Sequence, residues 1–314
     1  ISADALIDLK SIVEANGGPY IELNIGMHYF EGLTIQQKYA VSELDNTLRS
    51  MNLGGVFFVV TFPFHGKVVS FKHNERIIGG LIGSSNLANI VENKAHRQYE
   101  VDYRLPEDDC NKLDDFITKL RETTTRPFNE IEVKVIESRN NLLDEQYGVE
   151  KADSQVVESI KANPDFEYEF RVPLKTDGAT KSNLNTFNGK GRENKQGFVM
   201  PRSWYEVELI VPASILRLEG FPLKGIQGES IEVITDDGWM FRCESNGQNG
   251  KNFRSQGDLK ILGKWMKGRL EHAGALKTGE LVTQLTLNTY GRSDFVLAKL
   301  RGSDLWYLDF GVGN

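Results

Sequence analysis

A histidine and a lysine separated by one residue, His65 and Lys67, have the types and spacing that fit chemistry on a phosphate group. Side chains two residues apart on a strand lie on the same face, so both could contact one phosphate. A neutral imidazole can attack phosphorus and form a covalent intermediate, while an ammonium group neutralises the phosphate oxygens. The pair therefore predicts phosphodiester cleavage through a phosphohistidine.

Two polar residues, Ser84 and Asn86, follow the apolar run that comes after Lys67. Residues 68–82 predict a β-hairpin, because apolar segments flank a polar turn at its centre. Such a hairpin would return Ser84 and Asn86 to the side of the histidine-lysine pair. There a hydroxyl and a carboxamide could donate hydrogen bonds to the phosphate oxygens, as the donors of an oxyanion site do.

A carboxylate is needed to hold the histidine in one tautomer or to carry its proton. Glu100, which opens a predicted strand beyond Asn86, is the first candidate, and Glu92, in a predicted helix, is the alternative. His28 and His96 are further candidates for acid-base work. The acidic residues near the motif lack the spacing of metal ligands, so we expect neither a metal ion nor another cofactor.

Helices and apolar strands alternate in the part of the chain that would position these residues. The pattern predicts, in order, helix 3–16, strand 20–27, helix 34–51, strand 54–62 and a mainly helical segment over 106–165. Such alternation favours a mixed α/β sheet that is covered by helices. We predict a first domain over residues 1–165.

Short strands dominate the rest of the chain, and turn residues such as Asp-Gly and Asn-Gly separate them. The predicted elements are strands at 166–174, 204–212, 230–244, 282–290, 295–300 and 305–311, with one helix at 259–274. Many short strands with few helices favour a small barrel or pseudobarrel. We predict a second, mainly-β domain over residues 166–314.

The charge of the chain is unevenly distributed. The net charge is −7, but residues 1–165 hold 17 basic and 26 acidic residues, whereas residues 166–314 hold 20 and 18. The basic residues of the second half gather at 181–202 and 242–269. Two basic segments on a nearly neutral domain indicate contact with a phosphate backbone.

The cellular context follows from what the sequence contains. No run approaches the roughly 20 apolar residues of a membrane-spanning helix, so we expect no membrane partner. The two cysteines, Cys110 and Cys243, are far apart in sequence and indicate a reducing compartment rather than a disulfide framework. We expect a cytoplasmic bacterial protein. Because the chain opens on Ile1 as though within an element, we also expect part of the fold to precede it.

The motif at the proposed phosphate site resembles a known signature. The pattern His-x-Lys at 65–67, followed by Gly-Ser-x-Asn at 83–86, is similar to that of the phospholipase D superfamily. The amino-acid sequence of the segment is most similar to restriction endonucleases of the NgoFVII type. The resemblance covers residues 1–105 and implies a phospholipase D-like fold. It implies His65 as nucleophile, with Lys67, Ser84, Asn86 and Glu100 around the phosphate.

Two features distinguish this chain within that superfamily. Members often have Asp five residues after the lysine, where this chain has Lys72, a difference that disfavours lipid hydrolysis. Superfamily active sites are generally built from two His-x-Lys motifs, and this chain has one. The resemblance therefore implies a homodimer with a shared active site, in which a second histidine protonates the leaving oxygen.

The second half carries its own resemblance. Residues 185–212 and 237–270 look like the DNA-recognition domain of the same nucleases, which is similar to the plant B-three pseudobarrel and contacts the major groove with two arms. The arms would be residues 181–202 and 242–255. The expected DNA-binding residues are Lys190, Arg192, Lys195 and Arg202 in the first arm, Asn246, Asn249, Lys251, Asn252 and Arg254 in the second, and Lys264 and Lys267 on the helix.

Together these observations predict a sequence-specific, type II-like DNA endonuclease that acts on double-stranded DNA. Some relatives work with a separate helicase-like ATPase subunit, and the acidic helices of 106–165 could offer its docking surface. Two alternatives remain open. One is a phospholipase D-like lipid phosphodiesterase or transferase, and the other is a DNA-binding regulator whose nuclease-like domain is not catalytic.

Overall fold

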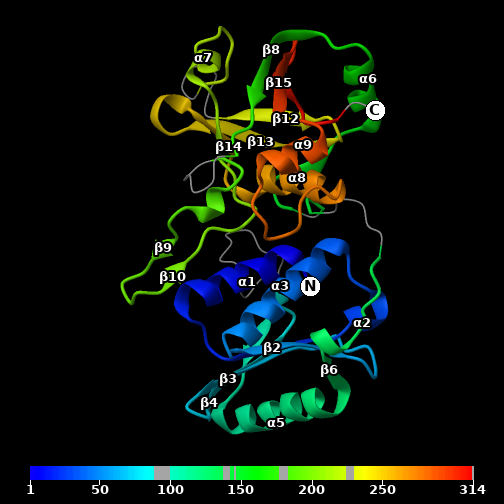
Figure 1. Ribbon diagram of the computed structural model, residues 1–314, viewed down its shortest axis with the longest axis vertical. Coiled ribbons are helices and arrows are strands. Elements are labelled where there is room, and N and C mark those ends of the chain that lie inside the picture. The colour runs from blue at the N-terminus through cyan, green and yellow to red at the C-terminus, as the bar shows by residue number, and fades with distance from the viewer. Residues whose placement is uncertain (88–99, 137–141, 145, 177–182, 224–229, 313–314) are drawn as a thin grey trace. The chain divides into compact units, whose positions relative to one another are not determined.

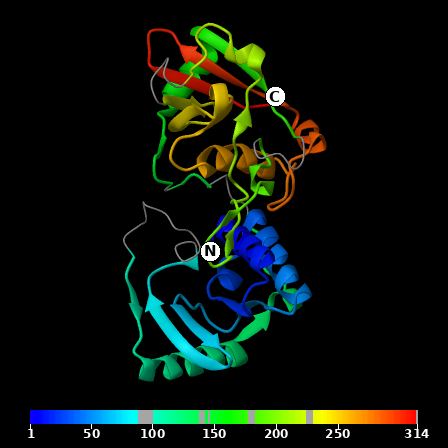
Figure 2. The ribbon, with the colours of Figure 1, turned by 90° about the vertical axis from the view of Figure 1, so that its left-hand side faces the viewer.

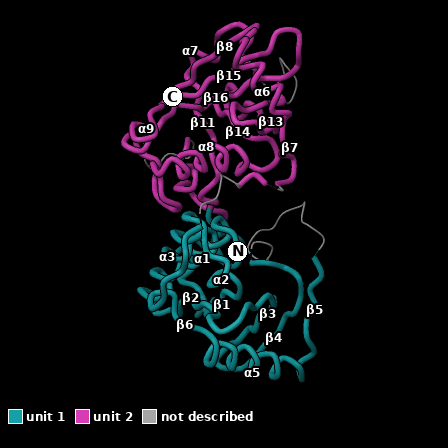
Figure 3. Tube along the Cα trace, turned by 90° about the vertical axis from the view of Figure 1, so that its right-hand side faces the viewer, with its two compact units in different colours: residues 1–138, 193–201 teal, residues 139–192, 202–314 magenta. Residues whose placement is uncertain are grey.

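Two compact units make up the computed structural model (Figure 1). Contacts between Cα atoms group residues 1–138 with 193–201 in unit 1, and residues 139–192 with 202–314 in unit 2 (Figure 3). The structure describes residues 1–87, 100–136, 142–144, 146–176, 183–223 and 230–312.

The first layer of unit 1 contains a small sheet and two packed helices. Strand β1 (Ile21–Ile25) runs parallel to β2 (Gly54–Val59), and β6 (Thr125–Pro127) pairs with β2 in the antiparallel sense. Helices α1 (Ala3–Asn16) and α3 (Ile35–Ser50) pack against each other, and α3 also packs on β2. The two helices and two parallel strands confirm the predicted alternation.

Helix α3 shows how local sequence fixes this layer. Thr34 begins the helix with a capping box, in which Gln37 donates its backbone N–H to the Thr34 hydroxyl at 3.2 Å and accepts the Thr34 N–H at 2.8 Å. Further along the helix, the buried Asp45 carboxylate accepts a hydrogen bond from the Val56 backbone at 2.7 Å and pairs with Arg49 at 2.8 Å. These bonds join α3 to β2.

A second, three-stranded sheet in unit 1 contains the predicted hairpin (Figure 2). Strand β3 (Lys67–His73) pairs with β4 (Arg76–Gly83), and β4 pairs with β5 (Asp102–Arg104), all antiparallel. Asn74 and Glu75 form the turn between β3 and β4, both with positive φ. The predicted hairpin is thus confirmed.

Helix α5 (Glu107–Thr124) covers one face of this sheet. Gly80 of β4 lets the helix approach closely, because a Cβ at this position would lie 2.9 Å from Leu113 of α5. Ser70 and Lys72 of β3 both contact Asp114 of the same helix at 2.8 Å. Lys72, which replaces the aspartate of the superfamily pattern, therefore faces α5.

Unit 2 is built around an eight-stranded sheet with the order β11-β14-β13-β12-β16-β15-β8, with β7 also paired to β13. The strands are β7 (Val149–Lys151), β8 (Phe166–Pro173), β11 (Leu209–Ile210), β12 (Ile231–Thr235), β13 (Trp239–Asn246), β14 (Asn252–Ser255), β15 (Asp294–Leu300) and β16 (Leu305–Asp309). The helices are α6 (Ser154–Ala162), α7 (Ala213–Leu216), α8 (Lys260–His272) and α9 (Gln284–Tyr290). The sheet curls into a half-barrel, which confirms the predicted pseudobarrel class.

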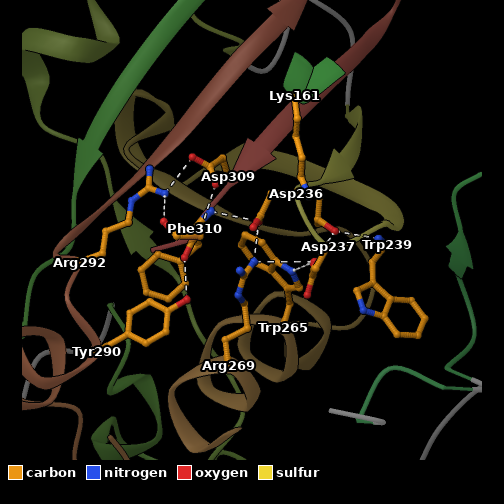
Figure 4. Close-up of polar contacts among 12 residues, drawn as sticks. Lys161, Asp236, Asp237, Trp239, Trp265, Arg269, Tyr290, Arg292, Asp309 and Phe310 are labelled. Carbon is orange, nitrogen blue, oxygen red and sulfur yellow. Dashed lines mark hydrogen bonds and ion pairs between the residues drawn. The ribbon is translucent and has the colours of Figure 1, made fainter. Parts of the chain in front are cut away.

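A buried polar network joins α8 to the turn between β12 and β13 (Figure 4). Arg269 of α8 donates to Asp236 at 2.5 Å, and the indole N–H of Trp265 donates to Asp237 at 2.8 Å. The Phe310 N–H donates to the same Asp236 carboxylate at 3.2 Å. Burial raises the pKa of Asp236, and the hydrogen bond with Arg269 opposes that rise. Each buried charge here therefore has a partner.

The predicted strand over 282–290 is wrong, because most of it forms helix α9. Thr283 accepts a hydrogen bond from the Thr286 N–H at 3.2 Å and donates its own N–H to the Thr286 hydroxyl at 3.0 Å. Leu287 and Tyr290 then lie buried on one helical face. The β-branched residues favour a strand, but this cap and the helical spacing of apolar residues prevail.

Residues 139–165 cluster with unit 2, although the sequence pattern grouped them with the first domain. Val157 and Ile160 of α6 pack into a buried cluster with Ile234 and Val296 of the large sheet. Strand β7 extends the same sheet at β13. These residues supply part of the apolar core of unit 2.

We predict that a fragment of residues 139–314 is more stable than one of residues 166–314, because the shorter fragment uncovers the apolar side chains beneath α6. Loss of a buried aliphatic side chain costs about 2–5 kcal/mol, and α6 contributes two of them, Val157 and Ile160. Thermal unfolding followed by circular dichroism measures the difference. A fragment of residues 153–314, which keeps α6 but not β7, separates the two contributions. Equal melting temperatures for all three fragments would contradict the prediction.

Candidate functional site

His65 and Lys67 lie side by side at the start of β3. The Lys67 Nζ is 3.1 Å from Nδ1 and 2.9 Å from Nε2 of His65, and it also donates to the His65 carbonyl at 3.0 Å. Strand β3 begins at Lys67, so His65 precedes the strand, and the expectation that both residues share one strand is wrong. The lysine side chain folds back along its own backbone to reach the imidazole.

The backbone around Phe64 holds His65 in place. The Phe64 N–H donates to the Gly26 carbonyl at 3.0 Å, and a Cβ on Gly26 would lie only 1.8 Å from the Phe64 carbonyl oxygen. The Phe64 ring packs against Phe116 of α5, with 6.2 Å between the ring centroids. A Cβ on Gly66 would lie 2.4 Å from the same ring. The residues on both sides of His65 are thus tightly restricted.

Strand register sets Ser84 one residue beyond the position that pairs with Lys67. Lys67 lies opposite Gly83, the residue before Ser84, across the β3–β4 ladder. The Ser84 hydroxyl donates to the Glu100 carboxylate and accepts a hydrogen bond from the Val101 N–H at 3.0 Å. The predicted serine and carboxylate therefore contact each other directly.

Asp102, which the sequence reasoning passed over, fixes the loop that carries Asn86. Its carboxylate accepts hydrogen bonds from the Ser85 hydroxyl and from the Ser85 N–H, the latter at 3.2 Å. A Cβ on Gly83 would lie 1.9 Å from the same carboxylate, so only glycine fits there. Asn86 follows this anchored pair with its side chain exposed. The alternation of polar residues at 100 and 102 is the sequence signal that could have identified Asp102.

Three further residues of the first half were candidates for acid-base work, and the structure describes one of them. Glu92 and His96 lie outside the described residues. His28, in the short helix α2 (His28–Glu31), is half-buried and contacts the amino group of Ile1 at 2.9 Å. Burial lowers its pKa. In the described part of the chain, no group of three or more His, Cys, Asp or Glu residues could hold a metal ion, and no helix could span a membrane.

The first predicted arm contains a small hairpin of β9 (Arg192–Glu193) and β10 (Val199–Met200). Its turn is organised by Asn194, whose side-chain oxygen accepts N–H donors from Gln196 and Phe198, both at 2.9 Å. Lys190, Arg192 and Lys195 are exposed, as DNA contact requires.

The same hairpin is fastened to helix α1 of unit 1. The Asn16 carboxamide donates to the Val199 carbonyl at 2.8 Å and accepts the Val199 N–H at 2.7 Å. Because both bonds join main-chain atoms of Val199, they do not depend on which side chain the strand carries there.

The second predicted arm is the hairpin of β13 and β14. Asn249 and Lys251 are exposed at its tip, and Asn249 has a positive φ of 60°. Asn246 and Asn252 lie directly opposite each other near that tip and are half-buried. Arg254 is held by carboxylates on two neighbouring segments of chain.

Three of the basic residues that were expected to bind DNA are buried or lie beside a carboxylate. Lys264 is buried and donates to Gln146 at 3.1 Å, while Arg202 lies 3.6 Å from Glu206. Lys267 is wholly buried, and burial lowers its pKa to about 7. Both lysines that were expected to contact phosphates are thus buried side chains of α8.

The surroundings of Lys267 explain its burial. Its Nζ donates to the Trp204 carbonyl and lies 4.4 Å from the Trp204 ring centroid and 4.8 Å from that of Phe187. Two aromatic faces and a carbonyl oxygen replace the water that an exposed ammonium group would bind. Charge counting along the sequence could not separate such a lysine from a solvated one.

Comparisons with known proteins cover both units. Residues 1–133 match the family model described as the NgoFVII restriction endonuclease N-terminal PLD domain. Residues 161–301 match the model described as the NgoFVII C-terminal B3-like DNA-binding domain. A comparison with curated proteins gave no match. With a phospholipase D-like domain followed by a B3-like DNA-binding domain, the chain belongs to the NgoFVII restriction endonuclease family.

Proposed function

We propose that this protein is a site-specific DNA endonuclease that cleaves phosphodiester bonds through His65, without a metal ion. The observation that carries the proposal is the register of β3 and β4, which pairs Lys67 with Gly83, the first residue of the Gly-Ser-x-Asn segment. The nuclease and DNA-binding families of the two matched segments support DNA as the polymer.

The first chemical step forms a bond between His65 and phosphorus. A ring nitrogen of His65 attacks with its lone pair, and the bond between phosphorus and the leaving deoxyribose oxygen breaks. Lys67, 2.9 Å from the ring, lies where its charge would meet the phosphate oxygens. The exposed Asn86 carboxamide would donate to the same oxygens.

The second step releases the phosphate from His65. A water molecule attacks phosphorus, the P–N bond breaks, and the imidazole is restored. The leaving oxygen of the first step needs a proton, and the water of the second step must lose one. Each transfer requires a second acid-base group beside the phosphate.

We propose that a second copy of the chain supplies this group, because the chain has one His-x-Lys motif. In a twofold-symmetric dimer the partner subunit's His65 would protonate the leaving oxygen and later accept the proton of the attacking water. Glu100 would orient Ser84, its hydrogen-bond donor, toward the shared phosphate.

The recognition arms would hold the DNA. The exposed Lys190, Arg192 and Lys195 and the exposed tip of the β13–β14 hairpin are suited to the phosphate backbone and the major groove. The acidic first turn of α5 could receive a separate helicase-like ATPase subunit. A cytoplasmic location in a bacterial cell would accompany this function.

We predict that His65→Ala lowers duplex cleavage by at least about 10³-fold, because the nucleophile is lost. Wild-type protein should cut equally well in excess chelator. Cleavage of supercoiled and linear duplex DNA measures both effects. His73→Ala, a histidine change at the exposed far end of β3, is the matched control and should leave cleavage intact. Cleavage abolished by chelator would refute the metal-free route.

We predict that Gly66→Ala lowers the single-turnover cleavage rate by about 100-fold, because the new Cβ displaces the Phe64 ring and shifts His65. Gly79→Ala on the same hairpin is the control, since its Cβ would make an ordinary 3.8 Å contact with Phe71. Melting temperatures of both variants show whether each still folds. Equal rates for the two variants would mean that the Phe64 contact does not position His65.

We predict that mixing equal amounts of wild-type and His65→Ala chains, with subunit exchange, leaves about a quarter of the dimers active, because each active site needs both histidines. Cleavage rates at several mixing ratios, with sedimentation of the mixtures, test this. A linear dependence on the wild-type fraction, or a monomeric active species, would exclude the shared site.

A further inference from the structure

A row of three charged side chains crosses the outer face of the large sheet in unit 2. Along β13, Phe241, Cys243 and Ser245 point into the core, so Glu244 points outward. Glu244 lies directly opposite Arg254 on β14. Glu208 precedes β11, the next strand in the sheet, and completes the row on the other side of Arg254.

The hydrogen bonds in this row use some, but not all, of the donors of Arg254. Its Nε and Nη2 donate to Oε1 of Glu244 at 2.9 and 2.8 Å, and its Nη1 donates to Oε1 of Glu208 at 2.8 Å. A guanidinium group has five N–H donors. Within the described part of the chain, one N–H on each terminal nitrogen of Arg254 has no hydrogen-bond acceptor. In the same part of the chain, Oε2 of Glu244 accepts no hydrogen bond.

The row is preorganised rather than flexible. The side chains of Glu208 and Glu244 are 10% exposed and that of Arg254 is 23% exposed, so their polar atoms are restricted yet reachable. Burial opposes the charge of Arg254, but the hydrogen bonds with Glu244 and Glu208 prevail and raise its pKa. Arg254 is therefore a fixed cation whose orientation two carboxylates determine.

The composition of the row suits base edges better than phosphates. Arg202 lies 4.0 Å from Glu208 and 3.6 Å from Glu206, so three carboxylates and two guanidinium groups gather around the row. Their net charge is negative, which disfavours a phosphate group. In the major groove, by contrast, guanine offers the acceptors N7 and O6, and its paired cytosine offers the N4 amino donor beside them. A donor pair next to a carboxylate acceptor is complementary to that pattern.

We propose that Arg254 and Glu244 read one G·C base pair in the major groove, and that Glu208 positions Arg254 for this contact. The two free N–H groups of Arg254 contact guanine O6 and N7, and the second oxygen of Glu244 accepts from cytosine N4. An A·T pair keeps the N7 acceptor, but it presents the adenine N6 donor in place of guanine O6 and the thymine O4 acceptor in place of cytosine N4. Arg254 then loses one of its two bonds, and the Glu244 carboxylate faces another acceptor. This inference rests on the proposed function, in which the β13–β14 hairpin enters the groove.

The test uses the full chain in a His65→Ala background, so that bound DNA is not cut. The protein is selected against a library of randomised duplexes, and affinities are then measured for the enriched sequence and for each single base-pair change. The parent should enrich a motif with at least one G·C pair. Glu244→Gln and Arg254→Lys should each reduce discrimination at that one pair by roughly 5- to 150-fold and leave the other positions unchanged.

Two further variants separate reading from structure. Glu208→Gln should weaken discrimination at the same pair only, as a positioning residue does. Glu232→Gln, an exposed glutamate on the neighbouring strand β12, is the matched control and should preserve the motif. Melting temperatures of all variants are compared with the parent.

Each remaining outcome has a defined meaning. An unchanged base preference in Glu244→Gln and Arg254→Lys overturns the inference. So does a uniform loss of affinity at every position with a lowered melting temperature, because that result shows a structural role. A parent that enriches no motif contradicts the proposed sequence specificity itself, whereas a parent motif that these variants do not alter contradicts only the G·C reading.

Discussion

The antiparallel register of β3, β4 and β5 is the constraint on which the catalytic half of the molecule depends. It sets Lys67, Gly83 and Asp102 in one line across three strands. Because side chains alternate between the faces of a sheet, a slip of one residue would move the lysine to the α5 side. The register is held by the close approach of Gly83 to Asp102 and by the Asp114 contacts of β3 with α5. The chemistry proposed for His65 thus depends on contacts that other residues of these strands make, at Gly83 and at Asp114.

Charged side chains differ in their burial between the two units. In unit 1, the groups proposed for catalysis lie at or near the surface, where a substrate phosphate could meet them. In unit 2, charged groups enter the interior and are matched there, as Arg269 is by Asp236 and Lys267 by the Trp204 carbonyl. Removing one partner of such a pair leaves an uncompensated charge in a poorly solvated place. The half-barrel of unit 2 therefore depends on specific polar pairing as well as on apolar packing.

Features that depend on neighbouring residues were largely predictable from the sequence. Features that depend on residues remote in sequence were not. The hairpin over 68–82 was predictable because its turn and its apolar flanks are adjacent in sequence. The helix over 284–290 was not, because a threonine cap outweighed the β-branched composition. Lys267 was expected on the surface of its helix because burial depends on Trp204 and Phe187, which are remote in sequence. Glu208 was passed over for the same reason, since its partner Arg254 is brought to it only by the sheet.

The hairpin of β9 and β10 has a consequence for how such proteins can change. Residues 193–201 belong to unit 1 by their contacts, although the matched DNA-binding segment spans 161–301. Replacement of that segment by recombination would bring in a foreign β10, yet Asn16 binds only main-chain atoms of Val199. Any residue except proline, which lacks an N–H, can make both bonds. The attachment is therefore tolerant of new sequences, and a nuclease domain could accept successive recognition domains without rebuilding its own surface.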